Sequence, residues 1–128
     1  MRRIVSLALL TGLIFSSALS AKVLSSPDGI DFAKPSLPLV VKFFATWCGP
    51  CSATNALFEG ASAALEGKAI FVKVDIDKYR SLANKYGVRS IPTFVFIGTD
   101  GAEKGRSVGG NTTQSQLVAK ATSLFNLG

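Results

Sequence analysis

The chain has 128 residues, of which 48% are hydrophobic, and it contains two cysteines and no histidine. This length suits one domain rather than two. A closed structural zinc site needs about four Cys or His ligands, and Ser–His–Asp or Cys–His catalysis needs a histidine base, so the composition excludes both. The formal net charge is +6, but the basic residues are scattered, so we expect no nucleic-acid partner. We also expect no metal and no cofactor.

The first twenty residues have the three-part pattern of a secretory signal peptide. Two arginines follow Met1, an apolar run extends from Ile4 to Leu19, and small residues surround Ser20. The run is shorter than the ~20 residues that a membrane-spanning helix needs. We therefore expect residues 1–20 to be cleaved as a signal peptide and residues 21–128 to be exported to the periplasm or the cell exterior. An uncleaved membrane anchor is the alternative.

The segment before the first strand is short and interrupted by prolines. Pro27, Pro35 and Pro38 leave room for a brief strand at Val23–Leu24 and a helical turn around residues 30–32. Hydrophobic periodicity then predicts seven elements. In chain order these are strand 39–44, helix 53–65, strand 69–74, helix 77–86, strand 93–97, strand 103–108 and helix 112–125.

Local signals fix several of these boundaries. Asp77 is expected to cap the second helix and Gly87 to end it. Asp100-Gly101 predicts a hairpin turn, and Thr113 with Gln116 matches a capping box at the start of the last helix. Strands separated by helices pair in parallel, and the hairpin adds an antiparallel strand.

Cys48 and Cys51 follow an apolar strand and open a helix. A disulfide between residues three apart removes little entropy from the unfolded chain, so a redox pair is favoured over a structural bridge. The N-terminal end of a helix stabilises a thiolate, which makes Cys48 the expected nucleophile. Cys51 lies on nearly the same helix face and can resolve a mixed disulfide. Pro50 suits the first helical turn.

The segment Phe43–Cys51, which includes Trp-Cys-Gly-Pro-Cys, resembles the active-site segment of thioredoxins. Lys73–Asp77, Tyr86–Thr93 and Gly110 follow in that family's order and nearly its spacing, and the resemblance extends from about Leu39 to the C-terminus. It implies an α/β thioredoxin fold, with a central mixed β-sheet flanked by helices. The short N-terminal region predicts that the first strand and helix are abbreviated.

The resemblance also implies a cis bond before Pro92 and a substrate-binding surface around the cysteines. This surface would consist of Trp47, Gly49, Pro50, Ile91, Pro92, Gly109 and Gly110. From the residues alone, Ile91–Pro92 would be a trans bond at the start of a strand, because cis is the minority state of X–Pro bonds. Trp47 could by itself be a core residue.

Some positions depart from the family pattern. Lys42 stands where thioredoxins carry a buried acidic residue. In that family the acid has a lysine partner, whose position Lys73 matches. The resemblance implies that the acid helps to deprotonate the second cysteine. Ala56 replaces a kinking proline and Ser52 a lysine. A buried ammonium must lose its proton, reach water or pair with a carboxylate, for which Asp75 is the candidate. We expect Lys42, Lys73 and Asp75 to tune the redox pair; the alternative is that the Lys42 amine is solvated.

These features predict a monomeric thiol–disulfide oxidoreductase that reduces or exchanges disulfides in extracytoplasmic proteins. Its partners would be protein disulfides and a thiol electron donor, in the membrane or in another protein. Two alternatives remain: a dithiol oxidant that forms disulfides, and a thioredoxin-fold binding module whose cysteines are not essential.

Overall fold

The computed structural model describes residues 22–128, so the expected signal peptide lies outside the described residues. Within that range, four strands form one sheet in the order β2-β1-β3-β4. The elements are β1 (Leu39–Phe44), α1 (Gly49–Ala53), α2 (Asn55–Ala64), β2 (Ile70–Asp75), α3 (Arg80–Lys85), β3 (Thr93–Ile97), β4 (Glu103–Val108) and α4 (Gln114–Phe125). None of the helices in residues 22–128 combines the length and apolar character needed to cross a membrane.

Strand β1 lies at the centre of the sheet and leads directly to the cysteine pair. It pairs in parallel with β2 and antiparallel with β3, and β3 pairs antiparallel with β4. Five of its six residues are buried, as its continuous apolar character predicts. The register places Lys42 between Lys73 of β2 and Phe94 of β3.

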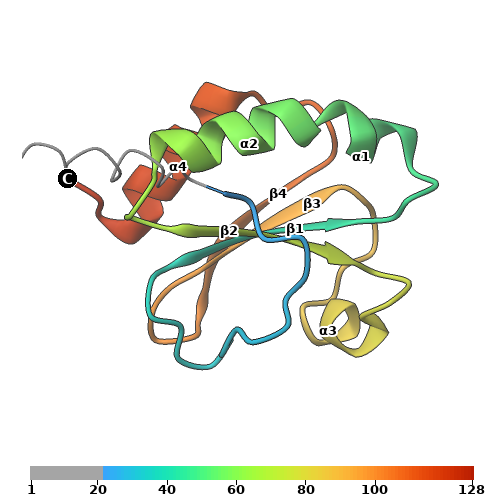
Figure 1. Cartoon of the computed structure of the whole chain (residues 1–128), viewed down its shortest axis with the longest axis horizontal. Coiled ribbons are helices and arrows are strands. Elements are labelled where there is room, and N and C mark those ends of the chain that lie inside the picture. The colour runs from blue at the N-terminus through green and yellow to red at the C-terminus, as the bar shows by residue number, and fades with distance from the viewer. Residues whose placement is uncertain (1–21) are drawn as a thin grey trace, which may run out of the picture.

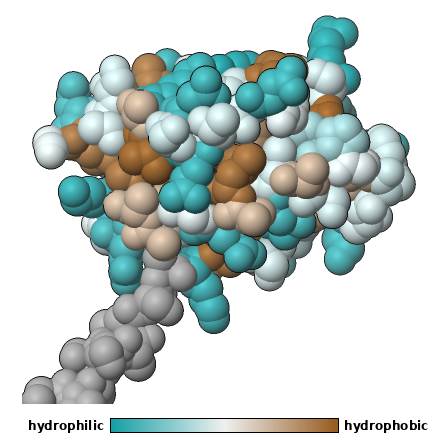
Figure 2. All heavy atoms as spheres, turned by 90° about the horizontal axis from the view of Figure 1, so that it is seen from above, coloured by the Kyte–Doolittle hydropathy of each residue, from teal (hydrophilic) through white to brown (hydrophobic). Residues whose placement is uncertain are grey.

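Helices cover both faces of the sheet. Figure 1 shows α1, α2 and α4 above the sheet and α3 below it, together with the segment that precedes β1. Alternate residues of β1 serve the two faces: Val40 packs with Phe58 of α2, whereas Val41 packs with Ala83 of α3. On the helical face seen from above, hydrophobic side chains emerge as separate patches among hydrophilic ones (Figure 2).

The N-terminal segment is more irregular than its sequence suggested. The expected strand is reduced to one bridge, in which Leu24 donates to the Phe71 carbonyl and accepts from the Lys73 N–H, both at 2.9 Å. The expected helical turn around residues 30–32 does not form. The Asp31 carboxylate accepts the N–H groups of Ala33 and Lys34 and so favours a local turn over a helix.

In place of the predicted helix 53–65 the structure has two helices, α1 and α2, separated by Thr54; α1 begins earlier than predicted, at Gly49. The Thr54 hydroxyl donates to the Cys51 carbonyl at 2.8 Å, and the Thr54 N–H donates to the same oxygen at 3.2 Å. These bonds tighten the last turn of α1, because they join residues three apart rather than four. The interruption therefore arises from a side chain and needs no proline at Ala56.

Asp77 does not cap α3, and that prediction was wrong. The helix begins at Arg80, its N-cap residue is Tyr79, and no side chain caps it. Asp77 is instead held by the active-site segment, because its carboxylate accepts the indole N–H of Trp47 at 2.9 Å. Gly87 follows the helix with φ of +61°, a conformation that glycine tolerates well.

The other elements agree closely with the sequence. Strands β1, β3 and β4 have the predicted bounds, and β2 is displaced by one residue. Thr113 and Gln116 form the predicted capping box, with the Thr113 hydroxyl accepting the Gln116 N–H at 3.2 Å and the Gln116 side chain accepting the Thr113 N–H at 3.0 Å. Helix α4 accordingly begins at Gln114.

Candidate active site

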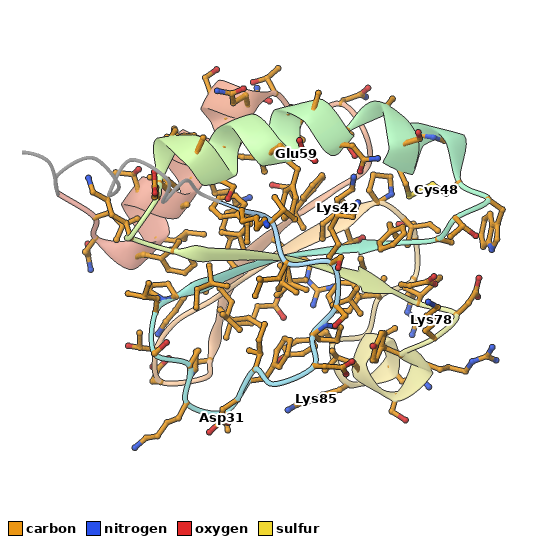
Figure 3. The ribbon with its side chains drawn as sticks, viewed as in Figure 1. Asp31, Lys42, Cys48, Glu59, Lys78 and Lys85 are labelled. Atoms are coloured by element: carbon orange, nitrogen blue, oxygen red, sulfur yellow. A yellow bond between two sulfur atoms is a disulfide. The ribbon has the colours of Figure 1, made fainter. Side chains whose placement is uncertain are left out.

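Cys48 and Cys51 form a disulfide at the N-terminal end of α1. Cys48 is the N-cap residue, and its sulfur accepts the Cys51 N–H at 3.1 Å. Pro50 occupies the first turn, where its missing N–H leaves no bond unmade. Cys48 is 7% exposed and Cys51 2%. Figure 3 shows the bond between the two sulfurs beside the label for Cys48, next to the loop that joins β1 to α1.

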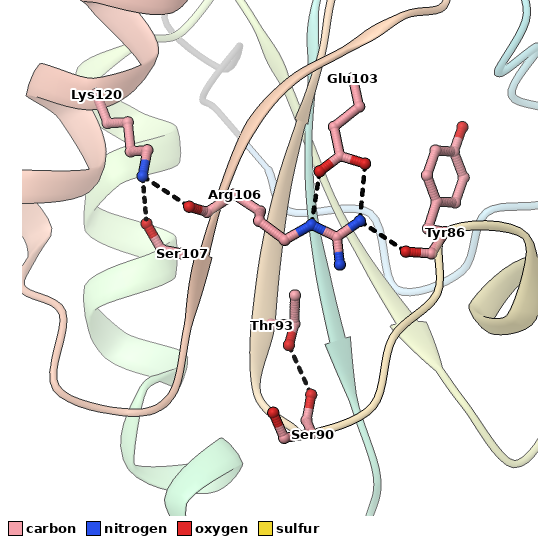
Figure 4. Close-up of polar contacts among 7 residues, drawn as sticks. All are labelled: Tyr86, Ser90, Thr93, Glu103, Arg106, Ser107 and Lys120. Atoms are coloured by element: carbon pink, nitrogen blue, oxygen red, sulfur yellow. Dashed lines mark hydrogen bonds and ion pairs between the residues drawn. The ribbon is translucent and has the colours of Figure 1, made fainter.

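The loop before β3 faces the cysteine pair. The Ile91–Pro92 bond is cis, as the resemblance implied. The Cys48 sulfur lies 3.9 Å from the Ile91 carbonyl oxygen. The Thr93 hydroxyl donates to the Ser90 carbonyl at 2.6 Å and thereby closes the loop around Pro92 (Figure 4).

The two glycines after β4 complete this side of the site. The Gly109 N–H donates to the Pro92 carbonyl at 2.8 Å, and Gly109 has φ of +98°, which side chains rarely adopt. A methyl group placed on Gly110 would lie 3.4 Å from Pro50. The structure therefore brings the predicted substrate-binding residues of three separate segments together beside Cys48.

Trp47 lies at the surface, which excludes a role as a core residue. Its side chain is 69% exposed and is oriented by the hydrogen bond to Asp77. Gly49 and Pro50 are also exposed. A second exposed apolar side chain, Val108, is 60% exposed and directly precedes the two glycines. Val108 was not among the residues predicted from the sequence, although its position next to Gly109 was an available signal.

Lys42 is completely buried between the sheet and α2, with an exposed fraction of 0%. Its Nζ donates to the Cys51 carbonyl at 2.8 Å and to the Asn55 side-chain oxygen at 2.6 Å. Burial and, to a smaller extent, nearby Lys73 lower the pKa of Lys42 to about 8, against the opposing effect of Glu59. The alternative of a solvated amine was therefore wrong. Figure 3 shows Lys42 beneath the helix that carries Glu59.

The expected partnership between Lys42 and Asp75 was also wrong. The Asp75 carboxylate accepts the N–H of Asp77 at 2.9 Å and thus stabilises a local turn. Asn55 takes the place expected for the acid, and it was not among the residues predicted from the sequence. Its position four residues after Cys51, about one helical turn further along the sequence, was the signal that could have found it.

Lys73 is the register partner of Lys42 on β2. Its Nζ is 5.3 Å from the centre of the Phe44 ring. It borders a pocket of about 200 Å³ that reaches both cysteines. The pocket is lined by Phe44, Ala45, Thr46, Cys48, Cys51, Ser52, Asn55 and Lys73. Within residues 22–128, no cluster of three or more His, Cys, Asp or Glu residues could hold a metal ion.

A polar network holds β4 against the end of α3 (Figure 4). The Arg106 guanidinium forms an ion pair with Glu103, with a shortest distance of 2.6 Å, and donates to the Tyr86 carbonyl at 2.6 Å. From α4, Lys120 donates to the Arg106 carbonyl at 2.7 Å. These contacts fix β4 on both sides and so support the glycine loop that follows it.

Comparison with solved structures places this architecture among known folds. The crystal structure of the Malassezia sympodialis thioredoxin Mala s 13 superposes with a TM-score of 0.67 and 36% identity, covering 81% of this chain and 90% of that one. The Drosophila melanogaster thioredoxin Deadhead gives a TM-score of 0.62 and 32% identity, covering 69% and 81%. The protein therefore has the thioredoxin fold, as the sequence predicted.

Sequence comparison identifies the family. The thioredoxin family model matches residues 30–123. Thioredoxin Asp f 28 of Aspergillus fumigatus is 41% identical over 86 residues, which are 67% of this chain and 79% of that protein. The chain belongs to the thioredoxin family. Thioredoxin-1 of Drosophila melanogaster is 42% identical over 59 residues, 46% of this chain, and the match spans only 55% of that relative's length.

Proposed function

We propose that the protein is a thiol–disulfide oxidoreductase that reduces or exchanges disulfides of extracytoplasmic proteins. The observation that carries this proposal is the Cys48–Cys51 disulfide at the start of α1, beside the Ile91 carbonyl. Membership of the thioredoxin family supports the redox role. The signal-peptide pattern in residues 1–20 supports the extracytoplasmic location.

The proposed reaction uses the two cysteines in order. The Cys48 thiolate attacks one sulfur of a substrate disulfide; that bond breaks, and the departing sulfur takes a proton from water. Cys51 then loses its proton and attacks the Cys48 sulfur, which releases the second substrate sulfur. Two electrons have passed to the substrate, and Cys48 and Cys51 are joined again. A thiol donor restores the dithiol by the reverse exchange.

The surroundings of Cys48 suit a protein substrate. Trp47 and Val108 expose apolar surface on two sides of the site, at 69% and 60%. Gly49 and the Gly109-Gly110 loop leave the backbone open between them, since nothing lies within 4 Å of a methyl group placed on Gly49 or Gly109. We infer that an extended substrate segment lies across Pro50, Ile91 and Pro92.

Reduction of insulin by dithiothreitol tests the proposal. Residues 21–128 should accelerate it, and Cys48→Ser should abolish the acceleration because the attacking sulfur is missing. Cys51→Ser should accumulate a mixed disulfide through Cys48, detectable by mass spectrometry. Ser123→Ala, an exposed change on α4 outside the pocket that reaches the cysteines, is the matched control. Full activity of the Cys48→Ser protein would exclude an oxidoreductase and favour the binding module.

The direction of electron flow needs a test of its own, because the Lys42 ammonium lies beside the cysteine pair and affects its reduction potential. A cation that stabilises the reduced form makes the pair a stronger oxidant, which favours the alternative of a dithiol oxidant. The reduction potential decides between them. A value of about −270 mV would indicate a reductant and one of about −120 mV an oxidant.

Export can be tested without the rest of the chain. A fusion of residues 1–30 to an alkaline phosphatase that is active only outside the cytoplasm should give phosphatase activity. Leu10→Arg, which places a charge in the apolar run, should abolish it. If the unmodified fusion shows no phosphatase activity, the protein would instead be an intracellular reductase.

A further inference from the structure

Among residues 22–128, Lys42 is the one charged residue whose side chain is completely buried. The oxygens that it contacts, the Cys51 carbonyl and the Asn55 side-chain amide, are both neutral. A buried ammonium without a carboxylate is costly, so such a group holds its proton weakly. A neutral amine keeps two N–H donors, which suffice for these two bonds. The geometry therefore accommodates both protonation states.

The charges that face Lys42 come from two elements. Lys73 is its register partner on β2 and Glu59 lies on α2, whereas α1 carries no charged residue and β3 presents Phe94. Phe58 of α2 places its ring 5.9 Å from Nζ. With the cysteines joined, burial and Lys73 lower the pKa of Lys42 to about 8, against the opposing effect of Glu59.

We propose that Lys42 is a redox-linked proton site, which binds its proton more tightly when Cys48 and Cys51 are reduced than when they form the disulfide. This inference rests on the proposed function, because it requires the pair to cycle. Reduction creates a thiolate within the single turn of helix whose carbonyl Lys42 contacts. In a site with little water, this negative charge favours the ammonium. By linkage, the ammonium favours the thiolate equally.

The protons and electrons balance. The disulfide takes up two electrons and one proton and becomes the Cys48 thiolate and the Cys51 thiol. In molecules whose Lys42 amine is neutral, reduction takes up one further proton from water and forms the ammonium; oxidation releases it. Lys42 does not touch the substrate and acts through the electrostatics of the pair, so it is a positioning residue.

Titration of the wild-type protein tests this without a variant. The lysine side-chain signals are followed by NMR from pH 6 to pH 11, in the oxidised and in the reduced protein. We expect the pKa of Lys42 to be higher in the reduced protein by at least about half a unit. Lys120, which lies on α4 and contacts β4, is the internal control, and its signals should not depend on the redox state. Equal pKa values for Lys42 in the two states would overturn the proposal.

A second measurement separates redox linkage from burial alone. The equilibrium of the pair with dithiothreitol is measured against pH. Around the two pKa values of Lys42, the wild-type equilibrium constant should change more steeply with pH than that of Lys42→Met, because reduction binds an additional fraction of a proton. The excess change should be about threefold in total if the two pKa values differ by about half a unit, and larger if they differ by more. Lys73→Met should raise the pKa of Lys42 in both states, because a like charge is removed. The same pH dependence in wild type and Lys42→Met would overturn the proposal.

The two proposals fail separately. A wild-type protein that reduces insulin but shows no redox-dependent pKa for Lys42 keeps the proposed function and loses the proton site. A protein that does not reduce insulin loses the proposed function, whatever Lys42 does. If Lys42→Met does not fold, the titration of the wild-type protein still decides.

Discussion

The two cysteines share a bond but have different surroundings. Cys48 caps α1 and is 7% exposed, whereas Cys51 lies inside the helix and is 2% exposed. Because the thiolate is the reactive form, we expect limiting iodoacetamide to alkylate Cys48 first in the reduced protein. Peptide mass spectrometry measures the ratio. Preferential alkylation of Cys51 would reverse the roles assigned to the two residues.

Lys42 should make the stability of the oxidised protein depend on pH. Its pKa is about 8 in the folded protein against 10.5 ordinarily, so between these values the unfolded chain binds more protons. The free energy of unfolding should therefore rise with pH in this window, by on the order of 1–2 kcal/mol between about pH 7.5 and 9.5. Urea denaturation measures it.

Lys42→Met provides the control for this pH dependence, because it removes the titrating group and should remove the rise. The urea denaturation series ends at about pH 9.5, below the range in which tyrosines ionise. The pKa of Tyr86 is raised by burial and by Glu103, so it stays protonated in the folded protein over this range. A rise of equal size in Lys42→Met would assign the effect to another group.

At the residue scale, the sequence predicted the unusual position but not its contacts. Lys42 was recognisable because a charge interrupts an apolar strand. The hydrogen-bond partner of Lys42 was not recognisable, because whether Asp75 or Asn55 binds its amine depends on which backbone groups compete for these two side chains. Asp75 serves the nearby Asp77 N–H, and local contacts of this kind are favoured over distant ones.

Among the elements, α4 offers the simplest test of a local signal. Thr113→Ala removes the hydroxyl that accepts the Gln116 N–H, and we expect it to lower the free energy of unfolding by about 1 kcal/mol. Ser123→Ala, an exposed change later in α4, should have a much smaller effect. Equal effects of the two substitutions would show that the cap does not stabilise the helix.

Strands were easier to predict than helix boundaries. The β-branched and aromatic runs of β1 and β3 follow or precede proline and glycine, which mark their bounds in the sequence. The break at Thr54 depends on one hydroxyl, and the late start of α3 depends on Asp77 contacting Trp47 thirty residues away. Hydrophobic periodicity contains neither contact.

At the scale of the whole molecule, the hairpin between β3 and β4 packs against the N-terminal segment. Gly101 has φ of +81°, and a methyl group there would overlap the Ala33 backbone. We expect Gly101→Ala to lower the free energy of unfolding by roughly 2 kcal/mol or more. Urea denaturation measures this loss.

Gly67→Ala is the matched control, since Gly67 has φ of +78° and nothing within 4 Å of the added methyl group. It should cost only the strain of the left-handed conformation, about 1 kcal/mol. If Gly101→Ala lowers the free energy of unfolding no more than Gly67→Ala does, the N-terminal segment around Ala33 can move away from the added methyl group without loss of stability.

The family resemblance predicted the arrangement from Leu39 onward, but not how the preceding segment packs. That segment has no hydrophobic periodicity, so only its proline content was informative. Ile30 and Phe32 nevertheless pack against the core on the α3 side of the sheet. They contribute apolar contacts without regular structure, which no pattern of two or 3.6 residues can indicate.

The Leu24 bridge also bears on self-association. It occupies hydrogen-bonding groups of Phe71 and Lys73 on the outer side of β2, groups that an extended strand of another molecule could otherwise use. The opposite margin, β4, carries Glu103, Lys104 and Arg106, whose charges discourage such pairing. Leu24→Pro, which lacks the N–H, should therefore promote concentration-dependent association measurable by sedimentation velocity. Unaltered sedimentation would show that the Leu24 bridge is not what prevents β2 from pairing with another molecule.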